Sequence, residues 1–257
     1  MSEELFNEKY FREHGHGSSY SEEYWRGSLR ILKWFEHRFK IISYEISKAK
    51  VVVDLGCGLA HSSHVIRTMN PYAFIIAIDI SDVALRRAKE LYGNDYMLQF
   101  IVGDACSIPL RSNSVDVIVS IELYEHLENP LRMLSEVYRV LRGKGTALIA
   151  TPNARSLSAI IRKDKWIELR DDTHISLTTP EQLRKNLVKV GFDNINCFTH
   201  GFPFLNIIGR ILNKLIKAPL GLGAEIICIA IKGKSRESFH SNEIWKRNVQ
   251  FDDKPTC

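Results

Sequence analysis

The chain has 257 residues, of which 45% are hydrophobic and 25% are charged, and its formal net charge is +5 at pH 7. This length accommodates one large domain with a buried core, or at most two small ones. The composition excludes a disordered or fibrous protein. A charge excess this small is more typical of a solubility property than of a nucleic-acid-binding surface.

Residues 1–49 form an N-terminal extension in which we expect a long helix over residues 22–49. The first residues are polar and lack the apolar core of a signal peptide. Aromatic residues and arginines occur together in this extension: Tyr20, Tyr24, Trp25, Arg26 and Arg30. One hypothesis is that the rings cover a bound ligand while an arginine pairs with its carboxylate. The alternative is an aromatic stripe that packs in the core.

From residue 50 onward, short apolar runs alternate with helical patterns, which is typical of βαβ units and a parallel sheet. The predicted strands cover residues 50–55, 73–79, 98–102, 115–120, 146–151, 194–199 and 225–231. The first five are too continuously apolar for a sheet with one solvated face, so helices are expected on both faces. We therefore predict an α/β fold, Rossmann-like and doubly wound. Its seven-stranded sheet should be mostly parallel, with the last strand antiparallel.

Capping residues and glycines delimit the helices between these strands. Helices are expected over residues 82–92, 130–142 and 180–190, with Ser81, Asn129 and Thr179 as N-caps and Gly93, Gly143 and Gly191 at the ends. Residues 50–234 then form the main domain, and residues 235–257 a mobile tail. Residues 152–178 are unusually long for a connection, which predicts a lid or an acceptor-binding insertion.

Scattered cysteines and charged residues argue against two further classes of protein. The five cysteines form no CxxC pair, so we expect neither a disulfide framework nor a zinc site. Charged residues interrupt the most apolar late stretch, residues 202–231, which therefore does not predict a membrane span. The basic amphipathic pattern of residues 202–222 fits a helix packed on the sheet, and the alternative is weak contact with a membrane surface. These features predict a cytoplasmic location.

The first strand ends in a motif that favours a particular ligand. Asp54 closes the strand, and the turn Gly56-Cys57-Gly58 leads into a helix, so a ligand can approach the backbone closely. A dinucleotide fingerprint would need a third glycine where His61 stands. A carboxylate at Asp54 opposes a pyrophosphate but suits a ligand with an ammonium group, such as an adenosyl group with an amino-acid tail.

Two more carboxylates follow at the ends of the next two strands. Asp79, with Ile80 after it, is placed to accept hydrogen bonds from ribose hydroxyls. Asp104, in Gly103-Asp104-Ala105, is placed to accept one from an adenine amino group. Acidic residues at three consecutive strand ends, without a phosphate site, predict an adenosyl ligand that carries no phosphate.

These motifs resemble the class I S-adenosylmethionine methyltransferase family over about residues 50–151. The segments 125–130 and 174–183 make the chain similar to its small-molecule branch, typified by ubiquinone and menaquinone biosynthesis enzymes. The resemblance implies S-adenosyl-L-methionine as cofactor and the following contacts: Asp54, Gly56, Cys57 and Gly58 at the methionine moiety, Asp79 and Ile80 at the ribose, Asp104 and Ala105 at the adenine, and Ser120 or Ile121 lining the pocket. The chain departs from the pattern at Ala60, where many members carry glycine.

Methyl transfer needs alignment of the acceptor, and for an oxygen nucleophile it also needs removal of a proton. Glu122, Glu125 and His126 follow the fourth strand, and His174 follows the fifth. We expect Glu125, His126 and His174 to be the catalytic candidates, with His126 as general base. The Glu-x-x-Glu-His pattern holds a divalent cation in some quinone O-methyltransferases, but histidine is less usual around Mg²⁺, so we expect no metal here.

The favoured function is therefore methyl transfer to a small-molecule acceptor, at oxygen, on a quinone-like, lipid or glycan precursor. A second hypothesis is RNA or protein methylation, although the Asn-Pro-Pro-Tyr type of tetrapeptide is replaced by Ile121-Glu122-Leu123-Tyr124 and no nucleic-acid module is evident. A third is a non-catalytic cofactor-binding subunit or sensor.

Overall fold

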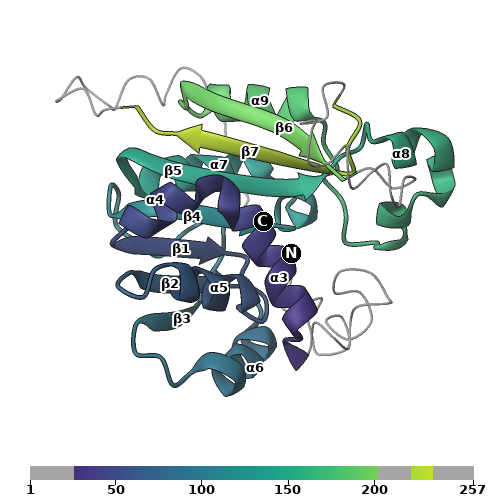
Figure 1. Ribbon diagram of the computed structural model, residues 1–257. Coiled ribbons are helices and arrows are strands. Elements are labelled where there is room, and N and C mark those ends of the chain that lie inside the picture. Colours follow the sequence, from purple (N-terminus) through teal and green to yellow (C-terminus); the bar gives the residue numbers. More distant parts are fainter. Residues whose placement is uncertain (1–25, 202–220, 234–257) are drawn as a thin grey trace.

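The computed structural model describes residues 26–201 and 221–233 (Figure 1). Its centre is a seven-stranded sheet with the strand order β3-β2-β1-β4-β5-β7-β6. The strands are β1 (Val51–Leu55), β2 (Phe74–Asp79), β3 (Leu98–Val102), β4 (Val115–Ile121), β5 (Leu141–Pro152), β6 (Asn194–His200) and β7 (Glu225–Ile231). Only β7 runs against its neighbours β5 and β6 within this sheet, which confirms the predicted doubly wound fold and the antiparallel last strand.

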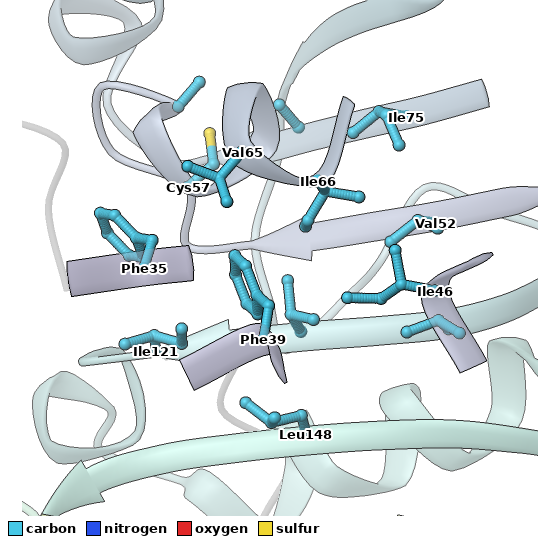
Figure 2. Close-up of a cluster of buried hydrophobic side chains, with 14 of the residues drawn as sticks. Phe35, Phe39, Ile46, Val52, Cys57, Val65, Ile66, Ile75, Ile121 and Leu148 are labelled. Carbon is cyan, nitrogen blue, oxygen red and sulfur yellow. The ribbon is translucent and has the colours of Figure 1, made fainter. Parts of the chain in front are cut away.

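Helices cover both faces of the sheet, as the continuously apolar strands predict. Against one face lie α3 (Leu29–Phe39), α4 (Ser43–Lys48), α5 (His61–Met69) and α6 (Asp82–Tyr92), and against the other lie α7 (Pro130–Val140) and α9 (Pro180–Lys189). Side chains of one strand alternate between the layers, so that Val52 joins the first core cluster and Val53 the second. Figure 2 shows Phe35 and Phe39 of α3 reaching into the first cluster.

The predicted N-caps are confirmed. The side chain of Ser81 accepts a hydrogen bond from the Ala84 amide, Asn129 accepts one from Arg132, and Thr179 accepts one from Gln182. Each contact satisfies an amide of the first helical turn that has no partner within its helix. Local sequence therefore sets where these helices begin.

The single helix expected over residues 22–49 is wrong within the described residues. α3 ends at Phe39, a 3-10 turn η2 (Lys40–Ile42) follows, and α4 begins at Ser43. The break gives two short helices that each keep an apolar face on the sheet, with Phe39 on one side of it and Ile46 on the other fully buried. Tertiary packing thus overrides a continuous helical periodicity.

The expected end of the helix at Gly143 is also wrong. α7 ends at Val140, and Leu141 has an extended backbone and pairs with Val115 of β4. β5 accordingly begins five residues earlier than the predicted start at residue 146. Leu141 matches the helical spacing by its apolar character, but pairing within the sheet decides its conformation.

The expectation that the cysteines form no disulfide needs correction. Cys197 of β6 and Cys228 of β7 are paired in register and form a disulfide, with a Cα–Cα distance of 4.1 Å. The two residues are 31 positions apart in the sequence. Only the antiparallel pairing of their strands brings them together, so spacing alone carries no signal of the bond.

The insertion after β5 contains α8 (Leu157–Arg162) and the 3-10 turns η4 (Lys163–Lys165) and η5 (Ile167–Arg170). A bridge between Asn153 and Thr178 closes its base. Trp166 is buried, whereas Lys163 and Lys165 are exposed, so this tryptophan anchors the insertion. Across the described residues, no helix has both the length and the apolar character that a membrane crossing requires.

Candidate functional site

The glycine turn after β1 folds back over the end of β2. Gly56 and Gly58 adopt left-handed conformations, with φ values of 73° and 50°. A Cβ on Gly56 would lie 2.9 Å from the Leu123 side chain, and the left-handed backbone would strain any other residue, so the position favours glycine. The amides of Gly56 and Cys57 both donate to the Ile78 carbonyl, at 2.8 and 3.0 Å. The turn is therefore fixed to the neighbouring strand.

Ala60 also lies in the left-handed region, with a φ of 59°. For an L-residue other than asparagine or aspartate, this conformation costs about 1 kcal/mol, whereas glycine adopts it freely. Many members of the family that this chain resembles carry glycine at this position. Ala60 keeps the backbone conformation that glycine adopts most easily.

Asp54 is buried beneath the turn and accepts hydrogen bonds from the hydroxyls of Ser62 and Ser63. Both serines lie in the first turn of α5. Burial raises the pKa of Asp54 to about 6, although the two serine hydrogen bonds oppose the shift. The carboxyl group thus ties the strand end to the helix start and holds the intervening turn in place. Direct contact between Asp54 and a methionine moiety stays a prediction.

Asp79 joins the same turn to the end of β2. Its Oδ2 accepts a hydrogen bond from the Gly58 amide at 2.7 Å, and its Oδ1 accepts one from the Ser81 amide at 2.8 Å. Burial raises the pKa of Asp79 above its usual value. Asp79 and the adjacent Ile80 remain half-buried at the carboxyl edge of the sheet, where parallel α/β sheets bind ligands. Cys57 is buried within the turn.

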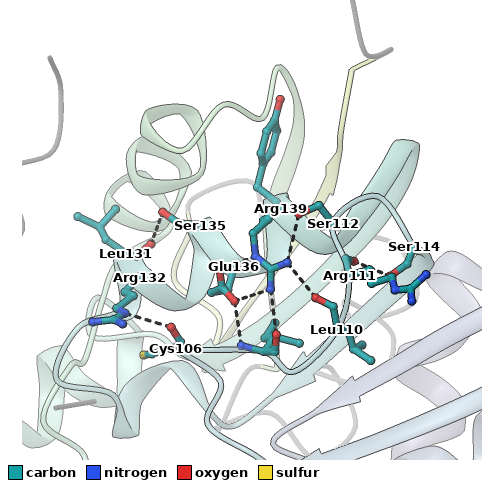
Figure 3. Close-up of polar contacts among 12 residues, drawn as sticks. Cys106, Leu110, Arg111, Ser112, Ser114, Leu131, Arg132, Ser135, Glu136 and Arg139 are labelled. Carbon is teal, nitrogen blue, oxygen red and sulfur yellow. Dashed lines mark hydrogen bonds and ion pairs between the residues drawn. The ribbon is translucent and has the colours of Figure 1, made fainter. Parts of the chain in front are cut away.

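The loop after β3 carries Asp104 and Ala105 and is held by α7. Asp104 accepts a hydrogen bond from the Cys106 amide at 2.7 Å. Arg139 donates to the carbonyls of Ile108 and Leu110, each at 2.9 Å, and forms an ion pair with Glu136 (Figure 3). These contacts fix a loop that has no regular secondary structure of its own.

The segment after β4 gathers buried acidic groups. Glu125 is fully buried; its Oε2 accepts a hydrogen bond from the Thr151 hydroxyl at 2.9 Å, while its Oε1 has no hydrogen-bond partner among the described residues. Burial raises the pKa of Glu125 to about 8. Glu122 has a left-handed backbone with a φ of 54°, and burial together with the charge of Glu125 holds its pKa well above the usual range. Ser120 precedes them in β4, buried, and its hydroxyl also lacks a described partner.

Two histidines lie beside Glu125. One ligand atom each from Glu125, His126 and His174 lies within 4.8 Å of the others, and the two imidazole rings are 4.7 Å apart between centroids. Burial lowers the pKa of His126 to about 4, with the neighbouring His174 adding to the shift, and burial also lowers the pKa of His174. The structure thus brings together the three residues that the sequence analysis selected from two distant segments.

Three contacts of this cluster were missed by the sequence analysis, and all come from the insertion. The hydroxyl of Thr173 lies 2.9 Å from His126 Nδ1. Oδ2 of Asp171 lies 3.8 Å from His174 Nε2, and Glu168 lies beside the same ring, with Oε2 3.5 Å from Nδ1. Polar residues clustered on both sides of His174 were the available signal, but no local pattern in the sequence indicated which of them contact the two histidines.

The aromatic residues expected to cover the ligand, Tyr20, Tyr24 and Trp25, lie outside the described residues, as does most of the 202–222 segment. Within the described part, the N-terminal helix contributes Arg38 to the same edge of the sheet. Arg38 forms a buried ion pair with Glu225 of β7, with two contacts of 2.9 Å, and its guanidinium lies over the Trp34 ring. Arg38 therefore anchors α3 at the carboxyl edge.

Comparison with known proteins agrees with this architecture. Residues 53–149 match the family described as "Methyltransferase domain". A probable S-adenosylmethionine-dependent methyltransferase of Mycobacterium tuberculosis is 29% identical over 128 residues, 49% of this chain and 44% of that protein. A malonyl-[acyl-carrier protein] O-methyltransferase of Methylococcus capsulatus is 30% identical over 145 residues, 56% of this chain and 52% of that protein. The chain thus spans about half the length of these curated relatives or less.

Solved structures share the fold. A SAM-dependent methyltransferase from Archaeoglobus fulgidus superposes with a TM-score of 0.63 at 20% identity, covering 86% of this chain and 98% of that one. A phosphoethanolamine N-methyltransferase of Haemonchus contortus in complex with S-adenosyl-L-methionine gives a TM-score of 0.56 at 19% identity, covering 72% and 49%. Residues 53–149 of this chain are therefore a methyltransferase domain, and the chain shares the fold of S-adenosylmethionine-dependent methyltransferases.

Proposed function

We propose that this protein is an enzyme that transfers a methyl group from S-adenosyl-L-methionine to an oxygen of a small-molecule acceptor. One observation carries the proposal: the glycine turn with Asp79 and the cluster of Glu125, His126 and His174 follow strands β1, β2, β4 and β5 at one edge of the sheet. A cofactor on the first group and an acceptor on the second would meet there.

The proposed cofactor contacts come from residues at the carboxyl ends of strands β1 to β4. The Asp79 oxygens accept backbone hydrogen bonds from Gly58 and Ser81 and keep further acceptor capacity, which suits ribose hydroxyls. Asp104 and Ala105 serve the adenine, and the turn around Gly56 and Gly58 serves the methionine moiety. The buried hydroxyl of Ser120 lines the pocket.

The acceptor side is proposed to lie at Glu125, His126 and His174. The sequence predicts no metal here. In the structure, however, one carboxylate and two imidazoles, with Glu125 Oε1 buried and without a described partner, fit a divalent cation that accepts mixed nitrogen and oxygen ligands. We propose that the three residues hold such a cation. When bound, it would lower the pKa of an acceptor hydroxyl and orient it. His126 remains the candidate general base if the acceptor reacts without a metal.

The first experiment tests cofactor and chemistry separately. Calorimetry should detect binding of S-adenosyl-L-methionine to the protein, and Asp79→Ala should weaken that binding. Formation of S-adenosylhomocysteine is then followed with phenolic, hydroxylated, amine, RNA and protein acceptors, with and without a chelator. Turnover only with RNA or protein would favour the second hypothesis. Cofactor binding without turnover of any acceptor would favour a sensor, and absence of binding would refute the proposal.

Amines are a second acceptor class that one observation favours. Glu122, Glu125 and Glu168 place several carboxyl groups near the proposed acceptor site. A cationic nitrogen bound beside these groups would lower their raised pKa values and pair with the ionised carboxylates. A relative from Actinopolyspora halophila, 28% identical over 66% of this chain, is a glycine/sarcosine/dimethylglycine N-methyltransferase. A faster reaction with amines than with hydroxyl compounds in the panel would reassign the reaction to nitrogen. A cytoplasmic location and membrane contact through residues 202–222 stay predictions from the sequence.

A further inference from the structure

The insertion after β5 contacts both histidines of the proposed acceptor site through hydrogen bonds whose direction can be assigned. Oγ1 of Thr173 lies 2.5 Å from Oδ1 of Asp171 and 2.9 Å from Nδ1 of His126. Nδ1 of His174 lies 2.9 Å from the carbonyl oxygen of Glu168. Each contact involves the Nδ1 atom of its ring, so in both histidines a residue of the insertion is hydrogen-bonded to Nδ1 and leaves Nε2 to other partners.

The proton positions follow from the chemistry of the partners. Two oxygens 2.5 Å apart need a proton between them, and a carboxylate has none to give, so the Thr173 hydroxyl donates to Asp171. The hydroxyl has a single proton, and its oxygen must therefore accept from His126. Nδ1 of His126 is thus the protonated ring nitrogen, and the lone pair of the neutral ring is on Nε2.

His174 reaches the same tautomer by a simpler route. A backbone carbonyl can only accept, so Nδ1 of His174 donates to Glu168. The insertion is also joined to the segment that it serves, since the Ser176 amide donates to the Glu125 carbonyl at 2.8 Å. The Ser176 hydroxyl donates to the Leu127 carbonyl. The proposed cation-binding residues and the insertion residues that contact them are therefore joined by hydrogen bonds into one connected unit.

We propose that Thr173 and Asp171 are positioning residues, which hold His126 in the Nδ1-protonated tautomer so that its Nε2 is the atom that serves the acceptor site. The inference rests on the proposed role of Glu125, His126 and His174. Second partners of this kind commonly change metal affinity by about 10- to 100-fold when removed. The insertion would then complete the site twice, by supplying His174 and by orienting His126.

The first test reads the tautomer directly and needs neither metal nor activity. Nitrogen-15 NMR of histidine-labelled, metal-free protein separates the protonated from the unprotonated ring nitrogen, and His126→Gln identifies the His126 signals. We expect protonated Nδ1 in the wild type and in Thr173→Ser, which keeps the hydroxyl. Thr173→Val should give a mixture or protonated Nε2. Protonated Nε2 in the wild type, or an unchanged spectrum in Thr173→Val, would overturn the proposal.

The second test measures the consequence for a cation. Co²⁺ is titrated into the full chain by calorimetry and by its visible absorption, with Thr68→Val as a matched control whose hydroxyl bonds only within α5. Thr173→Val should bind Co²⁺ about 10-fold more weakly or worse with an altered spectrum, while Thr173→Ser and Thr68→Val stay within about twofold of the wild type. Equal affinity and spectrum in Thr173→Val would contradict the positioning role.

The two proposals fail in distinguishable ways. If the wild type bound no Co²⁺ but the NMR result held, the cation role would be refuted and the tautomer assignment supported. If S-adenosyl-L-methionine did not bind, the proposed function would fail, whereas the NMR and Co²⁺ results would still decide the positioning role. Thermal unfolding of every variant checks that the chain is folded. The NMR and Co²⁺ results of a variant with an unchanged unfolding midpoint are compared directly with those of the wild type.

Discussion

Single carboxyl groups in this protein are used to hold the backbone around the site. Asp54 fixes the start of α5 through two serine hydroxyls, and Asp79 fixes the glycine turn through the Gly58 amide. Asp54 is buried and Asp79 is half-buried, and desolvation raises the pKa of each. A residue-scale change here therefore acts on folding stability as well as on the proposed cofactor site.

Asp54→Asn should change the pH dependence of stability. The pKa of Asp54 is about 6 in the folded chain against an ordinary aspartate value of 3.8, so its favourable contribution is complete below pH 3.8 and is lost as the pH rises through 6. From pH 5 to pH 8, the unfolding free energy of the wild type should fall by about 1 kcal/mol relative to Asp54→Asn. Urea unfolding at both pH values measures the difference. A constant or widening advantage of the wild type would contradict the buried-carboxyl account.

Asp79→Asn should weaken S-adenosyl-L-methionine binding. Loss of hydrogen bonds to a charged acceptor costs about 1.5–3 kcal/mol, which corresponds to a Kd roughly 10- to 100-fold higher. Calorimetry measures the change, and Asp82→Asn is the control, because Asp82 pairs with Arg86 on the exposed side of α6. An unchanged Kd in Asp79→Asn would remove Asp79 from the cofactor site.

At the scale of elements, α7 positions a loop that has no regular structure. Arg139, Glu136 and Arg132 reach from the helix to the loop after β3, where they bond carbonyls and one amide (Figure 3). The loop carries Asp104 and Ala105, which are proposed to meet the adenine. A few charge-assisted hydrogen bonds therefore couple the packing of α7 to the loop that carries the proposed adenine contacts.

Arg139→Ala should loosen that loop. We expect a loss of about 1–3 kcal/mol of unfolding free energy and a several-fold rise in the Kd of S-adenosyl-L-methionine. Arg86→Ala is the control, since Arg86 is exposed and its i,i+4 pair with Asp82 contributes roughly 0.5 kcal/mol or less. Thermal unfolding and calorimetry on both variants give the comparison. Equal effects of the two substitutions would show that the Arg139 contacts are not specific.

At the scale of the whole molecule, the sheet separates two apolar layers, and the proposed site lies at the edge where both layers end. α3 covers one layer and is fixed to β7 by the pair Arg38–Glu225, while the insertion returns to β4 through Ser176. A ligand bound at this edge contacts segments from much of the chain. Its binding should therefore stabilise the fold as a unit.

S-adenosyl-L-methionine at 100 times its Kd should add about 2.7 kcal/mol to the unfolding free energy, which corresponds to a rise of roughly 5–10 °C in Tm for a domain of this size. Differential scanning calorimetry over a range of cofactor concentrations measures the shift. At the same concentration Asp79→Asn should show a smaller rise. A Tm that does not depend on cofactor concentration would contradict binding to the folded chain.

Much of the fold could be predicted because its signals are local. Ser81, Asn129 and Thr179 cap the helices where their side chains allow, and β3 and β7 have the predicted bounds because short apolar runs between turn residues form buried strands. The pairing of Cys197 with Cys228 and the break after Phe39 could not be predicted, since strand register and helix packing decide them.

The candidate site likewise has features that local sequence predicted and features that only tertiary packing decided. The amino-acid sequence by itself determined the order of the strands' acidic ends and the glycine turn, because the carboxyl ends of parallel strands must meet at one edge of a sheet. The tertiary structure alone decided that residues 168–174 return to Glu125 and His126, and that Thr173 and Asp171 set a tautomer. Contacts between segments nearly fifty residues apart depend on how an irregular insertion packs, and no local pattern encodes that.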